Sequence, residues 1–140
     1  MREILFRGKS IEVIEMDRWV HGFYDNETYN EVYEVFCSKD TRHYINNQDD
    51  TVEVNPDTIG QYIGLRDNNG KRIYEGDIVT AEYGELKKIG YVFYYERGAK
   101  FGIRENSGYD NLSLLFDKTI KEWNIRVIGN IYDNPRLLGV

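Results

Sequence analysis

The sequence has few of the residues that most often carry catalysis or hold metal ions. Its 140 residues include one cysteine, Cys37, which excludes an internal disulfide, and two histidines, His21 and His43. Neither histidine has a cysteine or histidine partner at the spacing of a zinc site. We therefore expect no metal ion, no cofactor and no catalytic residue. A nucleophilic pair of Cys37 with a histidine is the weaker alternative.

Long apolar runs are also absent. No stretch approaches the roughly 20 apolar residues that a membrane-spanning helix needs. The first ten residues, MREILFRGKS, contain no hydrophobic signal core. These absences predict a cytoplasmic protein without membrane association, and a single thiol is consistent with a reducing compartment.

Basic side chains are too few to balance the acidic ones, and the net charge is −6. The acidic excess lies in the first half, where residues 1–70 hold 7 basic and 14 acidic side chains, a balance of −7. Residues 71–140 hold 11 basic and 10 acidic side chains, a balance of +1. Neutralisation of phosphates by Lys and Arg dominates nucleic-acid affinity. The charge therefore argues against nucleic-acid binding, less strongly for the second half.

No phosphate-binding glycine loop is present, because the glycines at 60, 64 and 70 lack the spacing of a dinucleotide-binding loop. Glu75 and Asp77 lie close together on an expected turn, and paired carboxylates can serve acid–base chemistry or bind a cation. Turn formation explains Asp77 equally well, since Asp bonds backbone amides in turns. We favour the structural interpretation and keep an enzyme with an unrecognised site as an alternative.

Aromatic residues, in contrast, are abundant, at 14% of the chain with 12 tyrosines. Tyrosine suits strands because it combines bulk with a polar tip. It is also enriched at protein interfaces. We favour a tyrosine-rich β core and keep an interface as the alternative.

Segments rich in strand-forming residues recur about every ten residues with turns between them, which is typical of a sandwich or barrel. We expect a mainly β fold with a small SH3-like barrel in the C-terminal half, from about Ile73 onward. Turns are expected at 8–10 and 25–26, and a bulge at Gly90. The expected strands are 3–7, 11–15, 19–24, 43–45, 51–54, 78–83, 88–95, 99–104, 112–116 and 123–131.

The segment from Glu27 to Cys37 is ambiguous. Its apolar residues fit helical spacing, yet it is also dense in strand formers. We favour strand because expected strands flank it on both sides. The residues at helical spacing are Tyr29, Val32, Tyr33 and Phe36.

The most informative stretch spans residues 54–79, VNPDTIGQYIGLRDNNGKRIYEGDIV. Asn55 before Pro56 predicts the N-cap of one short helical turn between Pro56 and Gln61. Thr58 and Gln61 have the spacing of a capping box, so the turn can begin at Thr58 instead. Further along, Asn69-Gly70 predicts a hairpin turn.

Gly76-Asp77 then predicts a second turn, which leads into a run of β-branched residues. We expect Gly70 and Gly76 to adopt backbone conformations that other residues resist.

This stretch resembles the YopX-like proteins of bacteriophages and prophages. Shorter matches at 4–8, at Trp19, at 22–24, at 127–132 and at 134–135 extend the resemblance over a single domain, 1–140. Residues 1–55 would form an N-terminal β segment, and 56–140 the central motif and barrel-like part. The motif residues, structural or in contact with a partner, are Gly60, Gln61, Tyr62, Gly64, Asp67, Gly70, Tyr74, Gly76 and Asp77.

The resemblance implies a small, β-rich, phage-encoded protein of unassigned function that assembles as a homo-oligomer. No catalytic residue comes with the family. We therefore expect a non-catalytic protein of the host cytoplasm that acts through contacts with itself and with an unidentified protein partner.

A nucleic-acid-binding accessory protein is the first alternative. Arg97, Lys100 and Arg104 are placed to share a strand pair, near aromatic residues at alternating positions. Basic and aromatic side chains on one sheet face are typical of proteins that bind single strands. We favour solvated edge charges instead, which discourage sheet aggregation. The aromatic residues are Tyr91, Phe93 and Tyr95.

Overall fold

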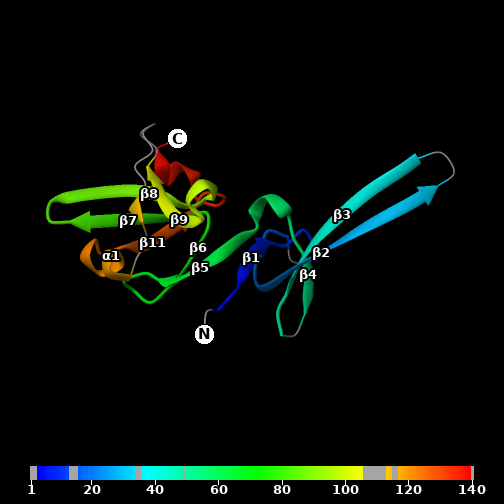
Figure 1. The fold of residues 1–140 in the computed structure, drawn as a ribbon, viewed down its shortest axis with the longest axis horizontal. Coiled ribbons are helices and arrows are strands. Elements are labelled where there is room, and N and C mark those ends of the chain that lie inside the picture. Colours follow the sequence, from blue (N-terminus) through cyan, green and yellow to red (C-terminus); the bar gives the residue numbers. More distant parts are fainter. Residues whose placement is uncertain are drawn as a thin grey trace. The chain divides into compact units, whose positions relative to one another are not determined.

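The structure is a computed structural model that describes residues 3–12, 16–33, 36–48, 50–105, 113–114 and 117–139. At 27–33, 36–40, 113–114 and 117–118 it describes the backbone alone. The chain forms two compact units, Glu3–Gln61 and Tyr62–Val140. Both are built mainly from antiparallel strands (Figure 1), so the predicted mainly β class is confirmed. The division at residue 55 within one domain stays a prediction.

Unit 1 is an antiparallel sheet of β1 (Phe6–Lys9), β2 (Trp19–Tyr33), β3 (Phe36–Asn46) and β4 (Thr51–Glu53). The strands pair in the order β4-β3-β2-β1, and the first residues of β5 (Gly60–Arg66) pair with β1. Its core is made of four aliphatic side chains, at most 3% exposed. They are Val20, Ile45, Val52 and Val54.

Several boundaries in unit 1 differ from the prediction. The turn expected at 8–10 is wrong, because Gly8 and Lys9 continue β1 and pair with Val20 and Trp19. The strand end expected at 25–26 is also wrong, because β2 pairs with β3 as far as Tyr33. Pairing across the strands outweighs these local turn preferences. In the strand expected at 11–15, residues 11–12 lie outside any strand and 13–15 lie outside the described residues.

The ambiguous segment from Glu27 to Cys37 is strand in its described residues, as we favoured. The helical turn is also present, as the 3-10 helix η2 (Pro56–Thr58). Asn55 is its N-cap, since its side chain accepts from the amide of Asp57 at 3.0 Å. The alternative start at Thr58 is therefore wrong.

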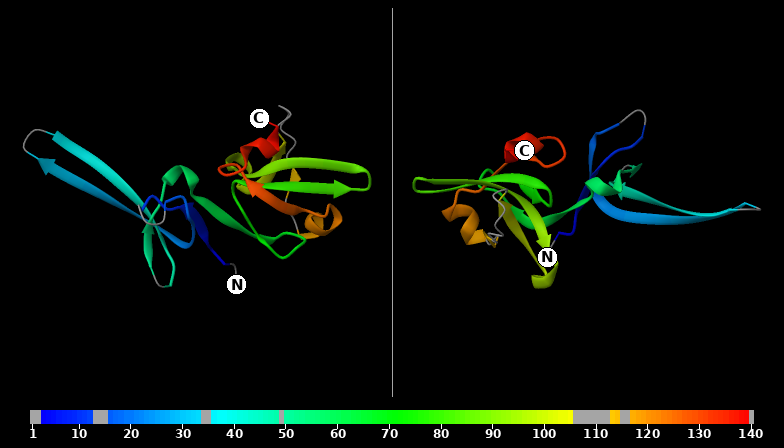
Figure 2. Two further views of the ribbon diagram at one scale, coloured as in Figure 1. Left: turned by 180° about the vertical axis from the view of Figure 1, so that it is seen from behind. Right: turned by 90° about the horizontal axis from the view of Figure 1, so that it is seen from above.

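Unit 2 contains the rest of β5, its hairpin partner β6 (Arg72–Tyr74) and a second antiparallel sheet. That sheet has the order β10-β9-β8-β7-β11, and Figure 2 draws unit 2 from two further sides. Among the described residues no pairing joins β10 to β11, so the SH3-like barrel stays a prediction. The strands are β7 (Asp77–Tyr83), β8 (Leu86–Tyr95), β9 (Lys100–Glu105), β10 (Ser113–Leu114) and β11 (Arg126–Asn130).

One face of this sheet forms the core of unit 2, together with α1 (Asp117–Glu122) and the β5–β6 hairpin. The bulge expected at Gly90 is wrong, since both ladders run through it without a shift. Gly90 is small because a Cβ there would lie 2.6 Å from a methyl carbon of Ile103. The core residues are Ile63, Ile73, Val79, Val92, Ile103, Ile120 and Ile125.

Helix α1 was not predicted, and the last strand begins at Arg126 rather than 123. Of the strand expected at 112–116, residues 113–114 form β10 and the others lie outside the described residues. Two further 3-10 helices complete the unit, η3 (Glu96–Gly98) and η4 (Pro135–Leu138).

Candidate functional site

Among the predicted motif residues, Asp67 makes the most far-reaching contacts. Its side chain is 6% exposed. Oδ1 accepts from the amides of Asn69 at 2.9 Å and Lys71 at 2.8 Å, which closes the β5–β6 turn. Oδ2 accepts from the amide of Val127 in β11 at 2.9 Å. The carboxylate is thus committed to holding a turn onto a strand.

Asp77 has a similar role at the next turn. It is 1% exposed, and Oδ2 accepts from the amide of Tyr74 at 2.8 Å. Between Tyr74 and Asp77, Gly76 has a φ of +86°. Its amide donates to the carbonyl of Val92, and its carbonyl accepts from the amide of Ile131, at 2.8 Å each. The structural interpretation of Asp77 therefore agrees with its geometry.

Tyr62 and Tyr74 are register partners in the β5–β6 hairpin. Both rings are buried, with centroids 5.7 Å apart, and the Arg72 guanidinium carbon lies 5.7 Å from the Tyr62 ring centre. Gly64, with a φ of +90°, lies where the pairing of β5 with β6 shifts register. Gly70 has a φ of +84° in the hairpin turn, as predicted.

The two remaining motif residues belong to unit 1. Gly60 pairs with Arg7, and Gln61 pairs with Phe6, in the β1–β5 ladder. The structure therefore gathers seven of the nine motif residues in unit 2 and places these two in unit 1.

Four motif residues, Tyr62, Gly64, Asp67 and Gly70, line an open groove of about 540 Å³ in unit 2. Arg66 is part of its wall, and its Nη1 donates to the carbonyl of Gly70 at 2.9 Å. The groove is thus lined by residues of β5 and its turn and by Ile120 and Lys121 of α1, and the Arg66 guanidinium is engaged in the turn. Nothing in this wall is arranged as a nucleophile with a base.

A second cavity, of about 230 Å³, lies between the core face of the five-stranded sheet and α1. Its lining is largely apolar and includes Trp123, whose ring lies 5.0 Å from that of Tyr83. Lys88 Nζ and Glu105 Oε1, 3.2 Å apart, are the charged pair among the lining residues. This cavity was not predicted, because the prediction did not include α1.

The histidines and the cysteine do not converge. His43 Nδ1 lies 2.8 Å from the hydroxyl of Tyr24, and the two rings are stacked. Cys37 is six positions from His43 along β3, about 20 Å at strand spacing. His21 pairs with Arg7 in the β1–β2 ladder, far along the sheet from the Val32–Cys37 pair. A nucleophilic pair between Cys37 and either histidine is therefore wrong.

The described residues contain neither a cluster that could hold a metal ion nor a membrane-spanning helix. Within them, no group of three or more His, Cys, Asp or Glu side chains is placed to hold a metal ion. Nor does the described part of the chain contain a helix long and apolar enough to cross a membrane.

The aromatic and basic residues of β8 and β9 do share a face, which we call the aromatic–basic face. Tyr91 pairs with Arg104 and Tyr95 pairs with Lys100, so their side chains point to the same side of the sheet. Phe93 lies between them on β8. Arg97 lies in η3 instead, so its predicted place in this strand pair is wrong.

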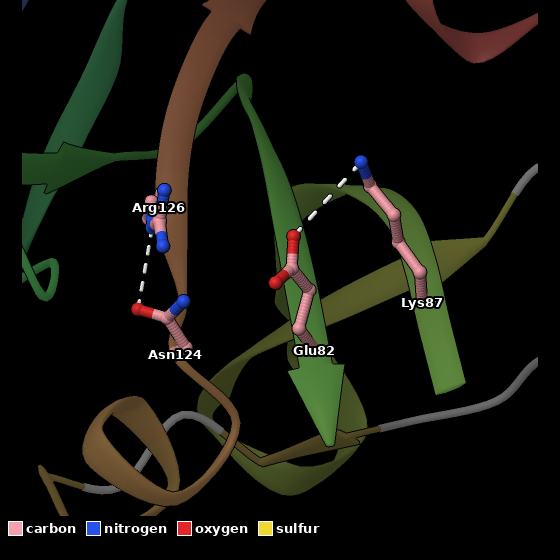
Figure 3. A network of polar contacts seen from close by, with 4 residues as sticks. All are labelled: Glu82, Lys87, Asn124 and Arg126. Carbon is pink, nitrogen blue, oxygen red and sulfur yellow. Dashed lines mark hydrogen bonds and ion pairs between the residues drawn. The ribbon is translucent and has the colours of Figure 1, made fainter. Parts of the chain in front are cut away.

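Polar contacts continue along β7, β8 and β11 (Figure 3). Glu82 Oε1 and Lys87 Nζ are 3.9 Å apart on facing strands. Arg126, the first residue of β11, donates from its Nε to the Oδ1 atom of Asn124 at 3.2 Å, and Asn124 lies just before the strand. Lys87 and Arg126 are exposed, and Glu82 and Asn124 are half-buried. Ion pairs this close to solvent contribute little to stability.

Comparison with known proteins adds two findings. A family model described as YopX protein matches residues 6–139. The chain also resembles the crystal structure of protein EF1440 from Enterococcus faecalis, at 20% identity, with 99% of each chain covered and a TM-score of 0.56. That likeness concerns the fold alone. No curated protein matches the chain.

Proposed function

This chain belongs to the YopX protein family, and from that premise we propose that it is a non-catalytic phage or prophage protein of the host cytoplasm. It acts by binding proteins, and its first partner is a second copy of itself. The observation that carries the proposal is a two-stranded extension of unit 1, residues 27–33 of β2 paired with 36–42 of β3, which we call the ribbon.

The ribbon has open edges. Its seven pairs run from Glu27–Arg42 to Tyr33–Phe36. The neighbouring strands β1 and β4 pair with other parts of β2 and β3. Strand β1 pairs with β2 at residues 19–22, and β4 pairs with β3 at residues 44–46. Within the described part of the chain the ribbon is therefore two strands wide (Figures 1 and 2).

A two-stranded hairpin alone is marginally stable in water. Its unpaired N–H and C=O groups also form a ready template for another strand. Both effects favour a contact in which a neighbouring copy pairs with the ribbon.

The charges of the two halves suit a contact between unlike edges. Residues 27–33 carry two acidic side chains and no basic one, while 36–42 carry two basic and one acidic. The balances are −2 and +1. An edge of β2 in one copy therefore attracts an edge of β3 in the next. A contact between unlike surfaces repeats around a closed ring when its rotation closes.

The contacts of the motif carboxylates also support a non-catalytic protein. Asp67 and Asp77, the two carboxylates, accept hydrogen bonds from backbone amides and hold turns. Such residues keep unit 2 folded and leave recognition to surfaces and strand edges.

The test is a variant with a shortened ribbon. Residues 27–42 are replaced by Asn-Gly, which joins the ladder partners Asn26 and His43 through a two-residue hairpin turn. Light scattering at micromolar concentration should give the parent a multiple of 16.5 kDa and the shortened variant a monomer mass. Glu85→Lys, an exposed charge change in the β7–β8 turn, is the control and should assemble as the parent does. A parent of 16.5 kDa throughout, or a shortened variant that still assembles, contradicts the proposal.

A further inference from the structure

The aromatic–basic face places cations directly over aromatic rings. The Arg104 guanidinium carbon lies 4.2 Å from the centre of the Phe93 ring, and Lys100 Nζ lies 5.8 Å from that of Tyr95. Gly102, the register partner of Phe93, has no side chain, which leaves the space beside the ring to Arg104. The guanidinium is therefore held against the ring before any ligand arrives.

Three aromatic side chains follow one another on this face of β8. Tyr91, Phe93 and Tyr95 alternate along the strand, so they repeat every 7 Å or so. The rings of Tyr91 and Phe93 lie 6.3 Å apart at their centres. All three residues are half-buried. The planes of the Tyr91 and Phe93 rings are inclined at 58° to each other, so each ring presents a separate surface.

The charge of the face is positive although the chain is acidic. Arg126 of β11 pairs with Thr80 of β7, and Thr80 pairs with Ile89 of β8. Ile89 lies two residues before Tyr91 on β8. Arg126 is therefore on the same side of the sheet as Lys100 and Arg104. Two carboxylates of the same sheet lie near these strands. Glu105 lies on the opposite side with Lys88 at 3.2 Å, and Glu82 on this side lies 3.9 Å from Lys87.

We propose that the aromatic–basic face binds single-stranded nucleic acid without sequence preference. Bases stack on the row of rings, since an aromatic ring is a platform that every base fits. Phosphates contact the cations Lys100, Arg104 and Arg126. The net charge of −6 weakens this attraction at long range, but ionic screening limits that effect to about 10 Å at 0.1 M salt.

This inference is independent of the proposed assembly, because it concerns unit 2 and the ribbon belongs to unit 1. The shortened-ribbon variant should therefore bind single strands with the same affinity per chain as the parent.

Fluorescence anisotropy of the full chain with labelled oligo-dT and oligo-U of about 12 nucleotides tests the proposal. We expect binding at low salt that weakens as salt rises. Lys100→Gln with Arg104→Gln should lower the magnitude of the salt slope by about 2. Lys88→Gln removes a charge from the opposite side and is the matched control, so its affinity should stay within about twofold of the parent.

A second variant separates stacking from charge. Tyr95→Leu keeps every cation, so it should weaken binding at least about fivefold with an unchanged salt slope. Thermal melting of each variant shows that its fold is retained. Three results would overturn the proposal. The first is absence of binding at low salt, and the second is an equal loss of affinity for Lys88→Gln and the double variant. The third is displacement of the labelled strand by polyglutamate as effectively as by unlabelled oligo-dT. The last result would assign the face to an acidic protein segment.

Discussion

The carboxylate of Asp67 accepts a hydrogen bond from the amide of Val127, 60 residues further along the chain. The same carboxylate closes the β5–β6 turn through the amides of Asn69 and Lys71. One side chain therefore fixes the hairpin of the family motif to the last strand of unit 2.

Asp67→Ala should lower the free energy of unfolding of unit 2 by at least about 3 kcal/mol. It leaves three backbone amides without their acceptor, and each bond to a charged group contributes about 1.5–3 kcal/mol. Asp67→Asn, which keeps one acceptor oxygen, should cost less. Chemical denaturation measures both, and Asp57→Ala, at an exposed position of η2, should change stability by less than about 0.5 kcal/mol. A small loss for Asp67→Ala would show that the turn is held by other contacts.

Gly76→Ala should destabilise more than Gly70→Ala. Both residues have positive φ, so each substitution introduces strain of about 1 kcal/mol or more. At Gly76 the new Cβ also meets the ring of Tyr132 at 3.0 Å, whereas at Gly70 nothing lies within 4 Å. Thermal melting of the two variants side by side gives the order. Equal melting temperatures would mean that the ring moves aside without cost.

Asn130→Ala should destabilise the end of β11 by about 1–3 kcal/mol. Its side-chain oxygen accepts from the amides of Tyr132 and Asp133 at 3.0 and 2.9 Å, and it is 9% exposed. Hydrogen exchange of the amides at 132 and 133 provides the measurement, since both should exchange faster in the variant. Unchanged exchange would show that other groups protect those amides.

Sequence patterns located the turns that depend on one or two residues, but missed those strand residues whose state depends on pairing. Asn55, Gly70 and Gly76 were predicted from local chemistry, because caps and positive-φ turns depend on one or two residues. Lys9 was placed in a turn, yet it continues β1, because its state depends on pairing with Trp19 in another strand. Such pairing is non-local and leaves no short signature.

The candidate surfaces show the same division. The alternation of Tyr91, Phe93 and Tyr95 marked the aromatic–basic face, and the register confirmed that these rings share it with two cations. The continuous ribbon was not predicted, because Asp25 and Asn26 favour turns and a turn was expected there. In the structure both residues lie inside β2.

The assembly should weaken as ionic strength rises, if unlike halves of the ribbon attract each other. The screening length falls from about 10 Å at 0.1 M salt to about 3 Å at 1 M. Light scattering across that range should show a falling mass for the parent chain. A mass that rises with salt would indicate an apolar contact in place of the proposed charge pairing.

The most direct measurement of the central claim is hydrogen exchange of the ribbon amides, at 27–33 and 36–42, in the full chain. In a two-stranded antiparallel ribbon about half of the amides bond across the pair, and the other half point outward. If neighbouring copies pair with the edges, more than half of these amides should exchange slowly at concentrations where the chain assembles. Protection of half or fewer at those concentrations would contradict assembly through the ribbon.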